Sequence, residues 1–314
     1  MKHDKIAILL LNWNGKQDTL ECLASLRHLT YRNAEIIVVD NGSTDDSLAA
    51  LRAQSVTLLE TGANLGFAGG NNVGIQYALQ HNFDWIFLLN NDTIVAPDIL
   101  DRLLDAASAQ PKAKVLGAKI LRYDKRNIID HLGGTWNPAI GEFVSPENGL
   151  PDDGTHDIMK PVDYVCGAAL LFHRSVALSI GLLETRYFLF WEESDYCFRA
   201  RRAGFEVWTA PKARVWHKVS SSFHGGKPHM HYYWWRSRLL WVARNLPPRD
   251  RRRLYRRVLL PDMLKALRHS LLRLPSALIP TRRPKLKRTL AGLAGIRDYL
   301  LNRFGPCPAW ISKR

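Results

Sequence analysis

The chain has 314 residues, and 46% of them are hydrophobic, which is enough to bury one large core or two smaller ones. Its four cysteines are far apart and form no CxxC pair, so the sequence excludes a zinc knuckle and a disulfide scaffold and indicates a reducing compartment. The formal net charge of +15 is unevenly spread, because residues 1–224 carry −4 and residues 225–314 carry +19.

From the sequence we expect neither a secretory leader nor a membrane-spanning helix. The apolar run at residues 6–11 is only as long as a strand before Asn12 interrupts it, too short for a secretory signal. No uncharged apolar stretch reaches the length of a spanning helix. We therefore expect a cytosolic or peripheral protein.

Short apolar runs alternate with stretches of helical spacing through the first part of the chain. The expected strands are residues 5–11, 34–39, 56–59, 85–89 and 114–121. The expected helices are residues 18–29, 47–53, 73–80 and 97–109. This order predicts an α/β fold with a mostly parallel, Rossmann-like central sheet flanked by helices, which binds ligands at the carboxyl ends of its strands.

The run that ends at Leu89 is followed at once by Asn90, Asn91 and Asp92. At a strand end, Asp92 is placed to hold a hard cation or a ligand hydroxyl, although a turn with a helix cap explains the same residues. The Gly/Asn-rich stretch 62–74, expected to be a loop, has neither the GxGxxG fingerprint nor a phosphate-binding GxxxxGK[ST] loop. A nucleotide bound here would therefore need another group to neutralise its diphosphate, and a divalent cation on Asp92 is the simplest choice.

Farther along, residues 124–157 look irregular, residues 162–173 are expected to form a strand, and residues 175–180 a short helix. A second polar cluster, Glu192, Glu193 and Asp195, precedes an expected helix at 196–203. Acidic residues suit a helix start, but a cluster beside aromatic residues also raises the pKa of one carboxyl toward that of a general base. Two further strands, 207–210 and 213–216, lead to His217 and the serines at 220–222; such a lone histidine is usually structural.

Five motifs in this order resemble one family: VVDNGSTD at 38–45, NLGFAGGNN at 64–72, Asn90-Asn91-Asp92, WEESD at 191–195 with RARRAGF, and WHKVSSS at 216–222. Over residues 5–245 the chain resembles the family 2 inverting glycosyltransferases of the GT-A fold. Within them it looks most similar to bacterial rhamnosyltransferases and galactofuranosyltransferase-like members.

The resemblance implies a donor site for a nucleotide diphosphate sugar. Asp40 matches the aspartate that binds the donor base, and Asn12 lies in the loop that meets the nucleotide. Other residues match the loop and the strand end that hold the diphosphate and sugar: Asn64, Gly66, Asn71 and Asn91. Asp92 and His217 match the ligands of a divalent cation, Mn²⁺ or Mg²⁺, with Asn90 in place of the first aspartate of the DxD motif.

The same resemblance implies the catalytic residues. Glu193 matches the base that takes a proton from the acceptor hydroxyl, although the family usually has Asp there, and Asp195 is the alternative acidic residue for the acceptor. The expected reaction inverts the anomeric carbon, with dTDP-rhamnose as first choice of donor and a UDP-hexose as second. The expected acceptor is a glycan or lipid-linked sugar in the synthesis of cell-surface polysaccharide. The resemblance therefore also implies a cytoplasmic protein that is peripheral at the inner face of the cell membrane.

We expect residues 1–224 to form the catalytic domain and residues 225–314 a basic helical extension. Leucines at near-helical spacing between 264 and 278, with Lys265, Arg268 and Arg273 among them, predict a basic amphipathic helix. It suits the surface of an anionic membrane, or it packs its leucines on the catalytic domain and leaves its charges in solvent. No nucleic acid is expected as a partner.

Two other functions remain open at this point. Asn90 and Glu193 depart from the family pattern, which would fit a protein that binds a nucleotide sugar without catalysis. The basic extension would fit an adaptor at a membrane or on a nucleic acid.

Overall fold

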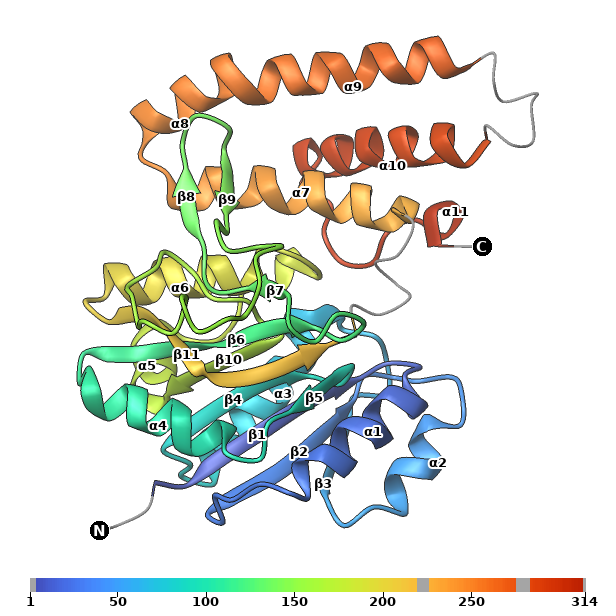
Figure 1. Cartoon of the computed structure of the whole chain (residues 1–314). Helices are drawn as coiled ribbons and strands as arrows, with labels where there is room; N and C mark the ends of the chain where they lie inside the picture. The colour runs from blue at the N-terminus through green and yellow to red at the C-terminus, as the bar shows by residue number, and fades with distance from the viewer. Residues whose placement is uncertain (1–3, 219–225, 275–282, 313–314) are drawn as a thin grey trace.

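The architecture is a nine-stranded sheet with helices on both faces and a layer of C-terminal helices above it (Figure 1). The computed structural model describes residues 4–218, 226–274 and 283–312. The expected boundary at 224/225, the serines at 220–222 and the last part of the expected amphipathic helix, from 275 to 278, lie outside these residues.

The first half of the sheet is parallel, as expected. Its order is β3 (Thr57–Glu60), β2 (Ala34–Asp40), β1 (Ile6–Asn12) and β4 (Trp85–Asn90). The register pairs Asn12 with Asp40 and Leu11 with Asn90. Because these strands run in the same direction, their polar last residues meet at one edge of the sheet.

The second half of the sheet is mixed. It continues from β4 through β10 (Ala169–His173), β6 (Ala113–Arg122), β11 (Glu206–His217) and β5 (Thr93–Val95). Strand β10 is antiparallel to both neighbours and begins seven residues later than the expected strand at 162. The two expected strands at 207–216 form one strand, β11, whose register shifts between Ala210 and Arg214. Strand β5, which was not expected, places Thr93 opposite His217.

Alternating side chains of the strands point into two cores. Ile8 and Leu10 face one core with α1 (Lys16–Leu26), α2 (Ser47–Arg52) and α4 (Ile99–Ala109). Ala7 and Leu9 face the other, with three more helices. These are α3 (Gly66–Gln80), α5 (Arg174–Ile180) and α6 (Glu192–Arg202).

Two expected helix starts were wrong. Helix α3 begins at Gly66, inside the stretch predicted as a loop, because its glycines let the helix lie close to strand β1. A Cβ at Gly70 would come within 2.4 Å of the Leu11 side chain, and one at Gly74 within 3.0 Å of Leu9. Helix α6 begins at Glu192 rather than Tyr196, so the acidic residues lie within its first turn.

The stretch 124–157 is largely irregular, as expected, but contains three short strands. Strand β7 (Ile129–His131) pairs with β6. Strands β8 (Thr135–Asn137) and β9 (Glu142–Val144) form a hairpin that rises toward the C-terminal helices (Figure 1).

The C-terminal region is helical, as expected. It comprises α7 (Pro228–Asn245), α8 (Pro248–Leu254), the π-helical turn η2 (Tyr255–Leu259), α9 (Leu260–Arg273), α10 (Arg283–Leu300) and α11 (Ala309–Ser312). Helix α7 packs on the segment that leads into α6, because its buried residues Trp241 and Leu239 share a core with Trp191. None of the described helices has the length and apolar composition required to cross a bilayer.

Candidate active site

The ends of β1 and β2 hold Asp40 in one orientation. Its side chain is 3% exposed and accepts hydrogen bonds from Asn12 Nδ2 at 2.8 Å and from the Ser43 backbone N–H at 3.0 Å. Asn12 is held in turn because its Oδ1 accepts a bond from the Thr19 hydroxyl at 2.9 Å. The two side chains expected to bind the donor base are therefore hydrogen-bonded to each other and fixed by their neighbours.

The start of helix α3 lies beside the acidic segment. Asn64 Oδ1 accepts bonds from the Gly66 N–H at 2.8 Å and from Asn41 Nδ2 at 3.2 Å. Gly66 has φ of +75°, and a Cβ there would lie 2.5 Å from the carbonyl oxygen of Phe188. The next residue, Phe67, donates its N–H to that same oxygen at 2.6 Å. A glycine is thus required where α3 and the acidic segment touch.

Asn71 lies within α3 and is 2% exposed. Its amide nitrogen donates to the carbonyl of Phe67, one turn earlier, at 2.9 Å. The structure therefore uses this side chain inside its own helix, whereas Gly66 and Asn64 lie at the helix start. The N–H groups of that first turn carry the positive end of the helix dipole, which favours an anion such as a phosphate.

Asp92 and His217, from distant parts of the sequence, lie side by side. His217 Nε2 is 3.1 Å from Asp92 Oδ1, and its Nδ1 is 4.0 Å from Asp130 Oδ2. Burial disfavours a charged imidazole, but the hydrogen bond and the charges of Asp92 and Asp130 outweigh it, so the pKa of His217 is raised. Neighbouring Asn91 donates its amide to the Thr19 hydroxyl at 2.8 Å, which connects this strand end to that of β1.

A carboxylate in the turn between β4 and β5 and an imidazole at the end of β11 suit a divalent cation that takes its remaining ligands from water and a diphosphate. Among the described residues, no group of three or more His, Cys, Asp or Glu side chains is placed to hold a metal ion. Asp130, on β7, is a second carboxylate beside His217. It was not among the expected site residues, because it lies in the stretch 124–157, whose sequence showed no regular pattern.

The segment before α6 has an unusual backbone. Phe188, Phe190 and Trp191 have φ of 62°, 65° and 73°, a region that non-glycine residues rarely occupy. Such conformations persist only where the surroundings enforce them, and they cluster at functional sites. Here the carbonyls of Tyr187 and Leu189 accept bonds from the Ser237 hydroxyl on α7, at 3.2 and 3.0 Å.

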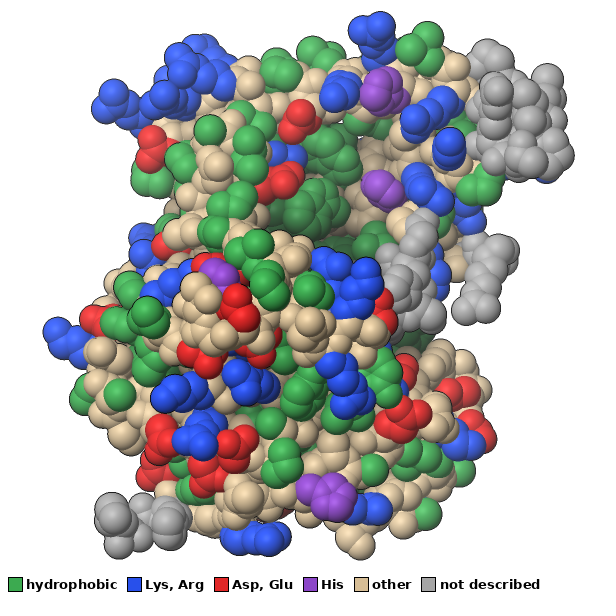
Figure 2. Space-filling model, viewed as in Figure 1, with side chains coloured by type: hydrophobic (Ala, Val, Ile, Leu, Met, Phe, Trp, Pro, Cys, Tyr) green, Lys and Arg blue, Asp and Glu red, His purple; other side chains and the backbone are tan. Residues whose placement is uncertain are grey.

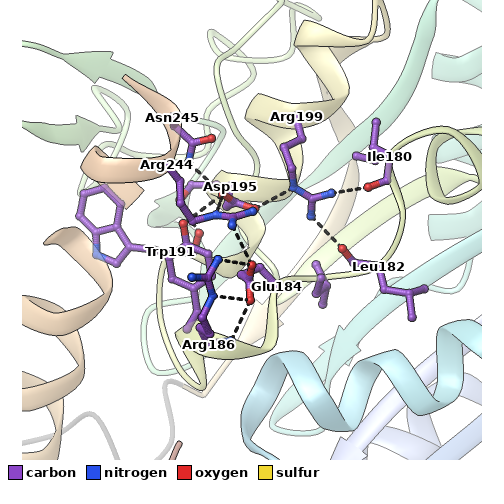
Figure 3. Close-up of polar contacts among 12 residues, drawn as sticks. Ile180, Leu182, Glu184, Arg186, Trp191, Asp195, Arg199, Arg244 and Asn245 are labelled. Carbon is purple, nitrogen blue, oxygen red and sulfur yellow. Dashed lines mark hydrogen bonds and ion pairs between the residues drawn. The ribbon is translucent and has the colours of Figure 1, made fainter. Parts of the chain in front are cut away.

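Asp195 lies in a closed polar network (Figure 3). It is fully buried, and its oxygens accept bonds from the Tyr187 hydroxyl at 3.0 Å, Asn245 Nδ2 at 2.8 Å and Arg199 Nε at 2.8 Å. Arg244 of α7 lies 3.4 Å from it and also pairs with Glu184 at 2.8 Å. The carboxylate of Asp195 is therefore used to join α6 to α7 and the preceding turn.

Glu192 and Glu193 differ from Asp195 because each has a buried Oε2 with no hydrogen-bond partner among the described residues. Burial, and then the nearby charge of Glu193, raise the pKa of Glu192 well above its ordinary value. Burial raises the pKa of Glu193 to about 7, against the opposing effect of backbone N–H groups at the helix start. Glu193 thus has the protonation behaviour that a general base near neutral pH requires.

The connection 166–168 lies between the two halves of the site. The Ala168 carbonyl accepts the Asn90 N–H at 3.0 Å, and Gly167 lies beside both Glu193 and Phe67. The structure therefore places the acidic helix start, the start of α3 and the polar end of β4 around one short segment. Nothing in the residues of this segment indicated that role.

The fold and this arrangement define a class, the GT-A glycosyltransferases. A mannosyltransferase from Pyrobaculum calidifontis, solved with GDP-Man and Mn²⁺, matches with a TM-score of 0.58 at 15% identity over 96% of this chain and 88% of that one. The structure of GalNAc-T7 with UDP, GalNAc and Mn²⁺ matches with a TM-score of 0.59 at 15% identity, over 76% of this chain and 51% of that one. These similarities establish the fold.

Residues 7–180 match the sequence pattern of Glycosyl transferase family 2, and the chain belongs to that family. It is 31% identical to an N-acetylglucosaminyl-diphospho-decaprenol L-rhamnosyltransferase of Mycobacterium tuberculosis, over 77% of this chain and 90% of the relative. It is 26% identical to the hexosyltransferase Agl10 of low-salt glycan biosynthesis in Haloferax volcanii, over 65% of this chain and 64% of that relative. The protein is thus a glycosyltransferase, as its motifs predicted.

Proposed function

We propose that the protein transfers a sugar from a nucleotide diphosphate sugar to a lipid-linked glycan acceptor, with inversion at the anomeric carbon. The observation that carries this proposal is Glu193, a half-buried residue whose buried Oε2 has no hydrogen-bond partner among the described residues and whose pKa is raised to about 7. The M. tuberculosis relative, named for a lipid-linked N-acetylglucosaminyl acceptor and for rhamnosyl transfer, supports dTDP-rhamnose as first choice of donor. A UDP-hexose is the second.

In the proposed mechanism, ionised Glu193 accepts the proton of the acceptor hydroxyl as that oxygen attacks the anomeric carbon. The C–O bond to the nucleoside diphosphate breaks in the same displacement, so the configuration inverts. Burial of Glu193 keeps its carboxylate poorly solvated and therefore basic. The transition state resembles an oxocarbenium ion, as in glycoside hydrolysis.

The donor is held at the opposite side of the site. Asp40 and Asn12 would bind the nucleoside. The positive end of the α3 dipole, with Asn64, Gly66 and Asn71, and Asn91 just after β4 would bind the diphosphate and sugar. Asp92 and His217 would hold a divalent cation, Mn²⁺ or Mg²⁺. When bound, such a cation neutralises the charge on the leaving diphosphate. Two solved structures with this fold contain Mn²⁺, which supports the choice of metal.

Calorimetric titration of the full chain with dTDP and with UDP, each with and without Mn²⁺, tests the donor site. We expect one nucleotide to bind, and its affinity to fall on the order of 100-fold without Mn²⁺ or in Asp92→Asn. Asp105→Asn, an exposed aspartate on α4, is the matched control and should not change binding. A folded protein that binds neither nucleotide would contradict the proposal.

A further inference from the structure

Helix α9 exposes its leucines and buries a polar residue. Leu264, Leu267 and Leu271 are 56%, 45% and 57% exposed, whereas Ser270 is 3% exposed. The three leucines follow one another at intervals of three and four, so they lie along one face of the helix. The other face packs against α10. The expected alternative, in which these leucines pack on the catalytic domain, is wrong for every one of them that the structure describes.

Positive charge is concentrated on α9 and on the two helical segments just before it, α8 and η2. Nine Lys or Arg and only two Asp occur between residues 248 and 274. Seven of the nine are exposed and pair with no acidic side chain in the described parts of the chain. These seven are Arg249, Arg252, Arg253, Arg256, Arg257, Lys265 and Arg268. Figure 2 shows a dense group of basic side chains over α8, at one end of the helical layer.

We propose that α8, η2 and α9 form a docking surface for an anionic lipid bilayer. Exposed leucines enter the boundary between headgroups and acyl chains, and flanking arginines remain with the phosphates, as in helices that lie in the plane of a membrane. Anionic headgroups are the complementary partner for a surface on which exposed leucines and exposed arginines occur together.

Charge and composition favour a bilayer over the other occupants of such a surface. A second copy of this chain would bring two strongly basic faces together, and their repulsion opposes that contact. A nucleic acid would pair with the arginines but would leave the leucines exposed to water. Only an anionic bilayer provides both the charge and the apolar depth.

The docking surface is joined to the catalytic part by buried Arg238 of α7. Its guanidinium donates to the carbonyl of Ile140 at 2.6 Å, in the β8–β9 turn, and lies 3.4 Å from Asp262 of α9. Trp136 and Phe143 of the same hairpin contact Trp191, the residue before Glu192. The membrane surface would therefore be held in a defined position relative to the acidic helix start. This part of the inference rests on the proposed function, in which the acceptor is a lipid.

Flotation of the full chain with vesicles tests the inference. The probes are vesicles of phosphatidylcholine alone and vesicles in which one third of the lipid is phosphatidylglycerol. We expect binding on the order of 100-fold stronger to the anionic vesicles, and strongly reduced by salt. Equal binding to both vesicles, or binding to neither, would overturn the inference without any variant.

Variants separate the two parts of the surface. Leu264→Gln/Leu267→Gln/Leu271→Gln should weaken binding to anionic vesicles at least about tenfold. Arg252→Gln/Arg253→Gln/Arg256→Gln should weaken it by a similar factor and remove most of the salt dependence. The matched control is Leu150→Gln/Ile158→Gln/Leu178→Gln, which changes three exposed apolar residues elsewhere (40%, 77% and 65% exposed) and should bind as the wild type does.

Two further measurements complete the test. Sedimentation of the same proteins would overturn the inference if the leucine variant loses a dimer and keeps its vesicle binding. Competition with DNA would overturn it if DNA displaces the protein fully from the vesicles. Nucleotide titration distinguishes the two proposals. A protein that binds dTDP or UDP but no vesicles would contradict the membrane inference alone. A protein that binds anionic vesicles but neither nucleotide would contradict only the proposed function.

Discussion

The proposed donor edge, where β1 and β2 end and α3 begins, and the acidic segment before α6 are built in opposite ways. At this edge, Asn12 and Asp40 lie at strand ends and Asn64 lies just before a helix. Their side chains are hydrogen-bonded to one another or to groups on the adjoining elements. In the acidic segment, three non-glycine residues have positive φ, and Trp191, Glu192 and Glu193 each have a buried polar atom without a partner in the described chain.

The proposed donor edge is therefore held by local hydrogen bonds, whereas the acidic segment is held by contacts with α7. The bonds from Ser237, Asn245 and Arg244 enforce the backbone of the acidic segment. Buried groups left unpaired by such a backbone are available to a substrate. We therefore expect changes at the donor edge to alter binding and changes in the acidic segment to alter turnover or stability.

The largest expected effect is on turnover. Glu193→Gln removes the proposed base while keeping its shape, so kcat should fall by about 10²–10⁴-fold, and nucleotide affinity should stay within about twofold. Steady-state kinetics and calorimetry on the same preparation measure both. Glu192→Gln is the comparison, because a larger loss there than at Glu193 would show that the wrong carboxylate was assigned.

The next effect is on stability. Asp195→Asn should lower the free energy of unfolding by about 3 kcal/mol, because Arg199 and Arg244 lose a buried partner. The chain contains a matched control, Asp98→Asn. Asp98 and Arg102 are also four residues apart on a helix and 2.9 Å apart, but their side chains are 43% and 45% exposed.

The exposed pair should contribute less than about 1 kcal/mol. Denaturant titration of both variants compares the two sites directly. Equal losses would mean that the network around Asp195 does not support the acidic segment.

A pair of glycines tests the contact between the two half-sites. Gly62 and Gly66 both have φ near +70°, but an added Cβ at Gly62 meets nothing within 4 Å, whereas at Gly66 it meets the Phe188 carbonyl. Gly66→Ala should destabilise the protein by about 2 kcal/mol more than Gly62→Ala, since both strain the backbone and only one clashes. Thermal unfolding gives the difference, and similar melting temperatures would refute the close approach.

The smallest effect concerns pH. Because Glu193 must be ionised and its pKa is about 7, kcat/KM should fall about tenfold between pH 7.5 and pH 6. Stability should change in the opposite direction. The folded-state pKa is raised above the ordinary value of 4.5, so the contribution of Glu193 to stability is complete below 4.5 and is lost as the pH rises through 7.

Unfolding measured across this range in the wild type and in Glu193→Gln isolates that contribution. The wild type should lose more stability than the variant as the pH rises from 4.5 to 7. Parallel curves would show that Glu193 is not buried as described.

Much of the catalytic fold could be predicted because its signals are local. Apolar runs such as 85–89 are continuous and end at polar residues, which defines a buried strand and its carboxyl end together. The start of α3 could not be predicted in this way. Its glycines are poor helix formers, and only the space left by Leu9 and Leu11 on the neighbouring strand explains them.

The sequence by itself determined the family, the parallel half of the sheet and the division of charge, since each depends on residue types and their spacing along the chain. Only the tertiary structure brought Asp130 to His217. It also distinguished Glu193, whose Oε2 has no partner among the described residues, from Asp195, whose two oxygens both accept hydrogen bonds. It also decided that the leucines of α9 face outward. The contacts of Asp130, Glu193 and Asp195 depend on which distant segments of the chain meet. The spacing of the leucines predicts that they share one face of a helix, but it does not predict whether another element covers that face.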